Sequence, residues 1–232
     1  MRRIFAFAIL PLLAACDVPT TTSSSSSEPL PQVARTGSPQ SVSDYRAVAA
    51  RVEPVAERAC RSLTEGVNCD FRLIIDNNPD LGANAYQTYD DNGRPILGMT
   101  PALIRDMRNR DELAFVIGHE AAHHIRGHIE QTQSSAQAGA IIGAVLGSVV
   151  GLDPTGVETT TNIGGTVGAR RFSKEFELEA DALGARIAEQ AGYDAVRGVL
   201  YFQDAFDPGN RFLGTHPPNA ERIRTVRQTV GR

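Results

Sequence analysis

The chain has 232 residues, of which 41% are hydrophobic and 22% are charged, and its formal net charge is −4. This composition is ordinary for a globular protein, and it excludes a collagen, a fully disordered chain and a polytopic membrane protein. The acidic balance provides no basic surface for nucleic acid, so we expect no nucleic-acid partner. Four of the five histidines fall between His119 and His128, which is the most informative feature of the composition.

The N-terminus resembles the signal of a bacterial lipoprotein. Two arginines precede an apolar run that extends to residue 15, which is too short for a membrane-spanning helix and is typical of a secretory signal. The sequence Leu13-Ala14-Ala15-Cys16 resembles a lipobox, which implies cleavage before Cys16 and lipid on its thiol. A plain signal peptide, with Cys16 near the cleavage site by chance, is the alternative. We therefore expect a signal peptide over residues 1–15 and a lipid-anchored protein of the bacterial cell envelope that faces the periplasm, on either membrane.

Residues 16–42 are rich in Ser, Thr and Pro. Such a segment cannot bury enough apolar surface to fold, so we interpret it as a disordered tether that begins at the lipidated cysteine. The folded domain is then expected over residues 43–232.

Two further cysteines, Cys60 and Cys69, lie close together in the sequence. Export implies an oxidising compartment, so we expect a disulfide between them, with two buried free thiols as the alternative. Their spacing matches no zinc-binding pattern.

Hydrophobic periodicity predicts helices and strands in the first half of the domain. An Asn-Gly turn at 92–93 predicts a hairpin, Thr100-Pro101 predicts a helix start, and Asp111 is the expected N-cap of a helix that ends near Gln131. The other predicted elements are a helix over 44–63 and strands over 71–75, 84–89 and 95–99.

Glycine recurs at every fourth residue in the segment 138–151. On a helix these glycines form a smooth ridge that permits close helix approach, but the segment is too short to span a bilayer. It is interpreted either as a helical hairpin or mobile flap, or as a site of membrane contact or self-association. Residues 152–168 are predicted to be a loop, so that 138–168 forms a Gly-rich insert. Helices are expected after it over 171–190, 195–205 and 218–229, and early strands followed by late helices indicate the α+β class.

The sequence His119-Glu120-Ala121-Ala122-His123 is an HExxH motif. Because residues four apart lie on one face of a helix, both imidazoles can bind one Zn²⁺, and Glu120 projects nearby as a base. Imidazole suits zinc, and a catalytic zinc keeps one of its positions for water. Zinc lowers the pKa of that water to about 7, and a carboxylate can then take its proton. A helix that merely carries surface histidines is the alternative.

Two histidines leave the metal site incomplete. The candidates for a third ligand are His124, His128, His216 and the carboxylates. His124 lies about 100° round the helix from His123, and His128 is also off the metal-binding face, so both are interpreted as surface or supporting residues. The metzincin extension HExxHxxGxxH is absent, which favours a glutamate. Spacing alone does not identify which carboxylate it is.

The segment from Ser173 to Ala182 resembles the second signature of the HtpX and CaaX-prenyl-protease family of gluzincin metallopeptidases, in which an ExxxD pair follows HExxH. The matching positions are Glu177 and Asp181. The resemblance implies that Glu177 is the third zinc ligand and that Asp181, one turn later, hydrogen-bonds a ligand histidine. Glu175 and Glu179 compete with Glu177, but each lies about 200° from it on the helix and is interpreted as part of a solvated face.

The sequence Thr215-His216-Pro217-Pro218, followed by Arg222-Ile223, is similar to the HP…RI segment of the same family. The resemblance implies that His216 lies near the metal, where it stabilises an oxyanion or occupies the water position in a resting state. It also implies that Arg222 orients the site or pairs with a carboxylate. A structural histidine at a helix start is the alternative for His216.

The family also has a strand beside its cleft, which Asn84-Ala85-Tyr86 and the strand ending Ile96-Leu97-Gly98-Met99 resemble. An exposed strand edge there would bind substrate backbone by strand addition, which tolerates many sequences. The substrate-binding residues expected on this basis are Asn84, Ala85, Ile96, Leu97 and Gly98.

The sequence therefore predicts an α+β, mainly helical zincin-type metallopeptidase domain with a small β-sheet and an HExxH helix. The resemblance implies an endopeptidase with one Zn²⁺ per chain that acts on unfolded or misassembled envelope proteins in quality control. One rival is a lipid-anchored chaperone or assembly factor with a latched or structural zinc site. Another is a membrane-surface binding protein that acts through 138–151. Glu120 favours the enzyme, because a structural zinc site needs no base. The sequence leaves the oligomeric state open.

Overall fold

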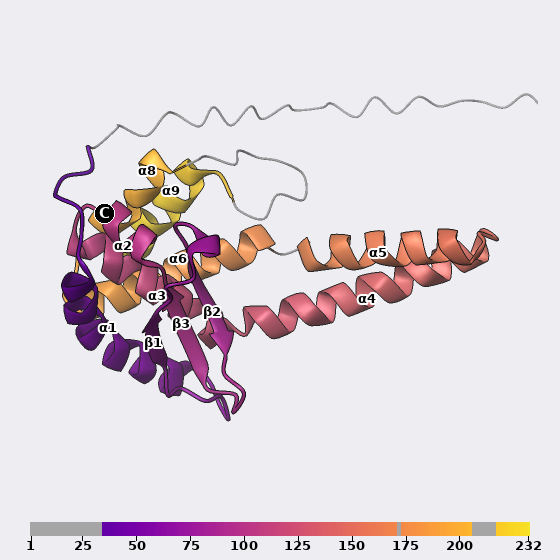
Figure 1. Ribbon diagram of the computed structural model, residues 1–232, viewed down its shortest axis with the longest axis horizontal. Helices are drawn as coiled ribbons and strands as arrows, with labels where there is room; N and C mark the ends of the chain where they lie inside the picture. The colour runs from indigo at the N-terminus through magenta and orange to yellow at the C-terminus, as the bar shows by residue number, and fades with distance from the viewer. Residues whose placement is uncertain (1–33, 171–172, 206–216) are drawn as a thin grey trace, which may run out of the picture. The chain divides into compact units, whose positions relative to one another are not determined.

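The computed structural model describes residues 34–170, 173–205 and 217–232 (Figure 1). The predicted signal peptide, the lipidation site Cys16 and the candidate site residue His216 lie outside the described residues.

Helices dominate the described domain and a small sheet accompanies them, which confirms the α+β prediction. The helices are α1 (Val42–Leu63), α2 (Pro101–Asp106), α3 (Arg110–Arg126), α4 (His128–Val149), α5 (Pro154–Arg170), α6 (Ser173–Gln190), α7 (Ala195–Val199), α8 (Tyr201–Asp204) and α9 (Asn219–Val230). The strands are β1 (Arg72–Ile75), β2 (Ala85–Tyr89) and β3 (Pro95–Met99), with a 3₁₀ turn at Pro79–Leu81.

The sheet has the strand order β1–β3–β2, with β1 parallel and β2 antiparallel to the central strand. Because β3 is buried and hydrogen-bonded on both sides, the prediction that Ile96, Leu97 and Gly98 bind substrate backbone is wrong. Within the described residues β2 pairs with β3 alone. The described sheet therefore has two outer edges, at β1 and at β2, and the one at β2 is available for strand addition.

The HExxH motif lies on α3, which packs against α1, α6 and α7. Its N-cap is Asn109, whose side-chain oxygen accepts a hydrogen bond from the backbone N–H of Glu112 at 3.0 Å. The prediction of Asp111 as the N-cap is wrong, because this residue lies in the first turn. Its carboxylate instead accepts from the backbone N–H of Asp194 at 3.0 Å and so ties α3 to the start of α7.

The prediction that this helix continues to Gln131 is also wrong, because α3 ends at Arg126. Gly127 has a φ of +66°, in the left-handed region that favours glycine, and its N–H donates to the carbonyls of His123 and His124. A second helix, α4, then begins at His128.

The predicted loop over 152–168 is instead the helix α5, which packs along α4 (Figure 1). A Cβ on Gly139 would lie 2.1 Å from the carbonyl oxygen of Gly164, so this approach requires glycine. The contact offsets the poor helix propensity of a Gly/Thr-rich sequence. The composition of the segment therefore predicted a loop where the packing stabilises a helix. The hairpin exposes large apolar side chains, including Ile142 at 60% and Val149 at 77%. None of the described helices combines the length and the apolar character needed to cross a membrane.

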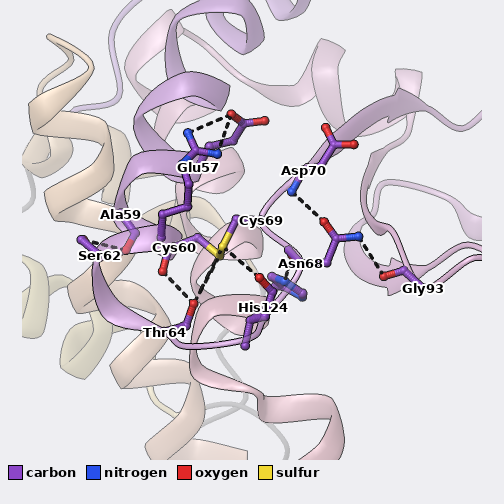
Figure 2. Close-up of a disulfide and its surroundings, with 12 residues drawn as sticks. Glu57, Ala59, Cys60, Ser62, Thr64, Asn68, Cys69, Asp70, Gly93 and His124 are labelled. Atoms are coloured by element: carbon purple, nitrogen blue, oxygen red, sulfur yellow. Dashed lines mark hydrogen bonds and ion pairs between the residues drawn. A yellow bond between two sulfur atoms is a disulfide. The ribbon is translucent and has the colours of Figure 1, made fainter.

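Cys60, near the end of α1, forms a disulfide with Cys69 (Figure 2). The loop that the disulfide closes is also joined to the HExxH helix, since His124 donates from Nε2 to the backbone carbonyl of Asn68 at 2.7 Å. Cross-linking a loop of this kind stabilises a fold mainly by restricting the unfolded chain.

Contacts with the folded domain begin before residue 43, within the segment that was interpreted as a tether. The guanidinium of Arg35 donates to the Glu112 carboxylate at 2.8 Å and to the Asp106 carbonyl at 3.1 Å. Both charged side chains are buried, so this ion pair anchors the start of the described chain beside the N-terminus of α3.

Candidate metal centre

Two histidines of α3 and one glutamate of α6 converge on a single point. The Nε2 atoms of His119 and His123 lie 3.0 Å apart, and Nε2 of His123 lies 3.3 Å from Oε1 of Glu177. Nε2 of His119 lies 3.6 Å from the other oxygen of the same carboxylate. The three ligand atoms are all within 4.8 Å of one another, and no other described residues form such a group. The fold thus brings together the three side chains that motif and resemblance single out.

A pair of glycines allows α6 to approach α3 closely enough for this convergence. A Cβ on Gly118 would lie 2.7 Å from the carbonyl oxygen of Gly184, and a Cβ on Gly184 would lie 2.7 Å from the backbone nitrogen of His119. Neither clash can be relieved by a side-chain rotation, because the atoms met are backbone. Sequence periodicity gave no signal for this pair, since isolated glycines in a helical pattern have many causes.

The donor set fits a zinc ion. Two imidazoles and one carboxylate are a ligand set of catalytic zinc sites, in which a further position stays open to water. Burial lowers the pKa of His123, but its hydrogen bond to Glu177 and the charges of Glu120 and Glu177 outweigh burial, so the pKa is raised overall. Because a ligand imidazole must be neutral, metal binding at this cluster is coupled to proton release.

Asp181 and Arg222 hold His119 in place on the side of its ring opposite the other candidate ligands. Nδ1 of His119 donates to Oδ1 of the fully buried Asp181 at 3.0 Å. Arg222 donates two hydrogen bonds to the same carboxylate, at 2.7 and 2.8 Å, and its guanidinium lies over the Phe202 ring at 3.6 Å. Burial alone would raise the pKa of Asp181, but the charge and hydrogen bonds of Arg222 lower it. An ionised Asp181 fixes the Nδ1–H tautomer of His119, which leaves Nε2 free for a metal.

Glu120 lies on α3 next to the three candidate ligands. It lines both of the cavities that adjoin them. Burial raises the pKa of its carboxyl, with the charges of His119 and His123 opposing that effect. A carboxylate with a raised pKa is a better proton acceptor than an exposed one, which suits the general-base role predicted from the motif.

A cleft runs along β2 past the cluster. One cavity, of about 540 Å³, is lined by Gln87, His128 and Phe176 among others. The second, of about 280 Å³, is lined by Asn84, Ala85 and the cluster itself. Asn84 and Ala85 therefore lie at the cleft as predicted, unlike the three residues of β3.

The family model named Peptidase family M48 matches residues 44–230. The chain belongs to peptidase family M48. This makes it a metallopeptidase-family protein, and the family is zinc-dependent. A crystal structure of Ste24p from S. mikatae is similar, with a TM-score of 0.49 and 18% identity over 74% of this chain. The chain spans about half of that protein, 49%. No curated protein matches the chain.

The two histidines that follow the HExxH motif, His124 and His128, differ in what they contact. His124 is buried and directed away from the cluster, with Nε2 on the Asn68 carbonyl and Nδ1 3.2 Å from the Tyr89 hydroxyl. His128 is equally buried, but its Nδ1 lies 2.8 Å from Nδ1 of His123. The prediction that His128 lies off this face assumed an unbroken helix, and the left-handed Gly127 breaks it. Gly127, a residue type typical of helix ends, is the signal that could have revealed this.

Proposed function

We propose that this M48 protein is a zinc-dependent endopeptidase, with one Zn²⁺ per chain held by His119, His123 and Glu177. The observation that carries the proposal is the convergence of these three ligand atoms within 4.8 Å, in a cleft that Glu120 also lines. When bound, zinc supplies a Lewis acid that acidifies water and polarises a carbonyl.

Glu120 takes the proton from the attacking water and passes it to the nitrogen of the leaving amine. This role needs a carboxylate that is ionised yet poorly solvated, and the raised pKa of the half-buried Glu120 supports it. Asp181 and Arg222 take no part in proton transfer. They orient His119 through the hydrogen bonds described above.

Substrate backbone pairs with the free edge of β2. Ala85 and Gln87 of this strand line the two cavities that flank the cluster, so an extended peptide along the edge would cross the metal. Strand addition recognises backbone more than side chains, which suits unfolded or misassembled proteins as substrates. We propose quality control of envelope proteins as the biological role.

Lipid on Cys16 would hold the enzyme to a membrane of the cell envelope, facing the periplasm. The lipobox-like sequence before Cys16 supports this location, and so does the disulfide between Cys60 and Cys69, which requires an oxidising compartment. Two or more lipid chains bind a bilayer stably, whereas one does not.

Hydrolysis of unfolded casein by the full-length protein in detergent tests the proposal, with Glu120→Gln and a zinc chelator run in parallel. Loss of the base should lower the rate about 10²–10⁴-fold while zinc content stays equal to that of wild type. Equal rates in wild type and variant would contradict the role of Glu120. An inactive wild type with one bound zinc would instead favour the chaperone or assembly-factor hypothesis.

A further inference from the structure

The break between α3 and α4 places a second imidazole behind His123. Since α3 stops at Gly127, whose φ is +66°, His128 begins a new helix and its ring turns back toward the metal cluster. Its Nδ1 lies 2.8 Å from Nδ1 of His123, which is hydrogen-bond distance. The contact involves the nitrogen of His123 that faces away from Glu177.

The proton positions along this contact follow from the metal side. Nε2 of His123 points at Glu177 and His119, so it must be unprotonated to bind a metal. Nδ1 of His123 then carries the proton and donates it, and Nδ1 of His128 must accept. This leaves the proton of His128 on Nε2, which faces a Glu179 carboxylate oxygen at 3.4 Å. Each ring nitrogen of His123 and His128 then has a compatible partner.

The ring of His128 is held in place independently of the metal. It is only 4% exposed, and it stacks on Phe176 with ring centroids 4.3 Å apart and an interplanar angle of 13°. An imidazole packed in one orientation presents a well-defined hydrogen-bond acceptor.

We propose that His128 is a positioning residue that fixes the tautomer and ring orientation of His123. It would do for this ligand what Asp181 does for His119, with an imidazole in place of a carboxylate. The inference rests on the proposed function, because it requires His123 to bind zinc through Nε2. Partners of this kind typically change metal affinity about 10–100-fold when they are removed.

The test compares zinc affinity in the full-length protein in detergent, measured by competition with a chromophoric chelator. His128→Phe keeps the ring that stacks on Phe176 but removes the acceptor, so zinc should bind about 10–100-fold more weakly. His128→Asn retains an acceptor oxygen near the position of Nδ1, and its affinity should stay within about threefold of wild type. His124→Phe is the matched control, because it removes an equally buried imidazole that does not contact the cluster.

A spectroscopic measurement supports the affinity series and needs no variant to fold. Long-range ¹H–¹⁵N spectra of the zinc-loaded wild type should show His123 protonated at Nδ1 and His128 protonated at Nε2. A His123 that binds zinc through Nδ1 would overturn the inference. So would a His128→Phe protein with wild-type affinity, or a His124→Phe protein with an equal loss. A wild-type protein that binds no zinc would contradict the proposed function itself, which separates the two failures.

Discussion

Two of the described helix pairs that meet through glycine differ in what surrounds the contact. Where α3 crosses α6, Gly118 and Gly184 bring the backbones together, and the neighbouring side chains are the histidines and carboxylates of the metal cluster. Where α4 runs along α5, glycines recur along the contact, and the hairpin exposes apolar side chains.

The same steric device therefore has two uses. At the α3–α6 crossing it shortens the distance between two helices so that polar side chains within about two turns of the crossing can share one metal ion. In the α4–α5 hairpin it lets two helices of low intrinsic propensity pack closely along their length, which stabilises them as helices. The comparison predicts that glycine substitutions in the two places will have different consequences.

The largest effect is expected for Gly184→Ala. The added methyl would meet the backbone nitrogen of His119 at 2.7 Å, so the two helices must separate and Glu177 must move away from the histidines. We expect zinc affinity to fall about 10–100-fold. Overpacking should also lower the free energy of unfolding by about 1–3 kcal/mol, against the small gain that alanine gives within a helix. Chelator competition and denaturant unfolding measure the two effects. Unchanged zinc affinity would show that the crossing does not position the cluster.

The matched substitution in the hairpin, Gly139→Ala, should leave zinc affinity unchanged. Its methyl would lie 2.1 Å from the Gly164 carbonyl oxygen, so α4 and α5 must separate there. We expect faster hydrogen exchange of the amides in these two helices and a loss of about 1–3 kcal/mol in their local stability. If zinc binding fell as much as in Gly184→Ala, the two helix pairs would not be independent.

The sequence predicts those parts of the site that depend on spacing within one helix, and it does not predict those that depend on contacts between elements. The HExxH spacing places His119 and His123 on one face whatever else the chain does, and the ExxxD spacing does the same for Glu177 and Asp181. The resemblance then supplied the pairing of the two helices, and the structure has that geometry. The two histidines were accessible because their placement depends on the period of one helix, whereas Glu177 and Asp181 were identified from the resemblance.

The features that sequence reasoning missed depend on contacts between elements or on a single backbone angle. Helix α5 forms because its glycines meet those of α4, which local propensity does not register. His128 reaches His123 because Gly127 is left-handed. The strand order β1–β3–β2 put Ile96, Leu97 and Gly98 in the centre of the sheet, and alternating hydrophobicity does not specify strand order.

The smallest effect is expected away from both helix pairs, at the start of α1. Hydrogen bonding from the Ser41 hydroxyl, followed by that from Arg110, lowers the pKa of Asp44 to about 2. Because the folded-state pKa lies below the usual 3.8, the ionised carboxylate stabilises the fold above that pH, and the contribution is lost as pH falls toward 2. Asp44→Asn should therefore flatten the decrease in stability over this interval without altering zinc affinity. Denaturant unfolding across the acid range measures it, and a parallel decrease in both proteins would contradict it.

The central claim is that His119, His123 and Glu177 hold one zinc ion, and X-ray absorption at the zinc edge tests it most directly. Wild-type protein should contain one zinc per chain, with imidazole and oxygen scatterers and no sulfur. Glu177→Ala should keep its circular dichroism spectrum but bind zinc more weakly, with a changed set of oxygen ligands. An unchanged absorption spectrum and affinity in Glu177→Ala would contradict the claim.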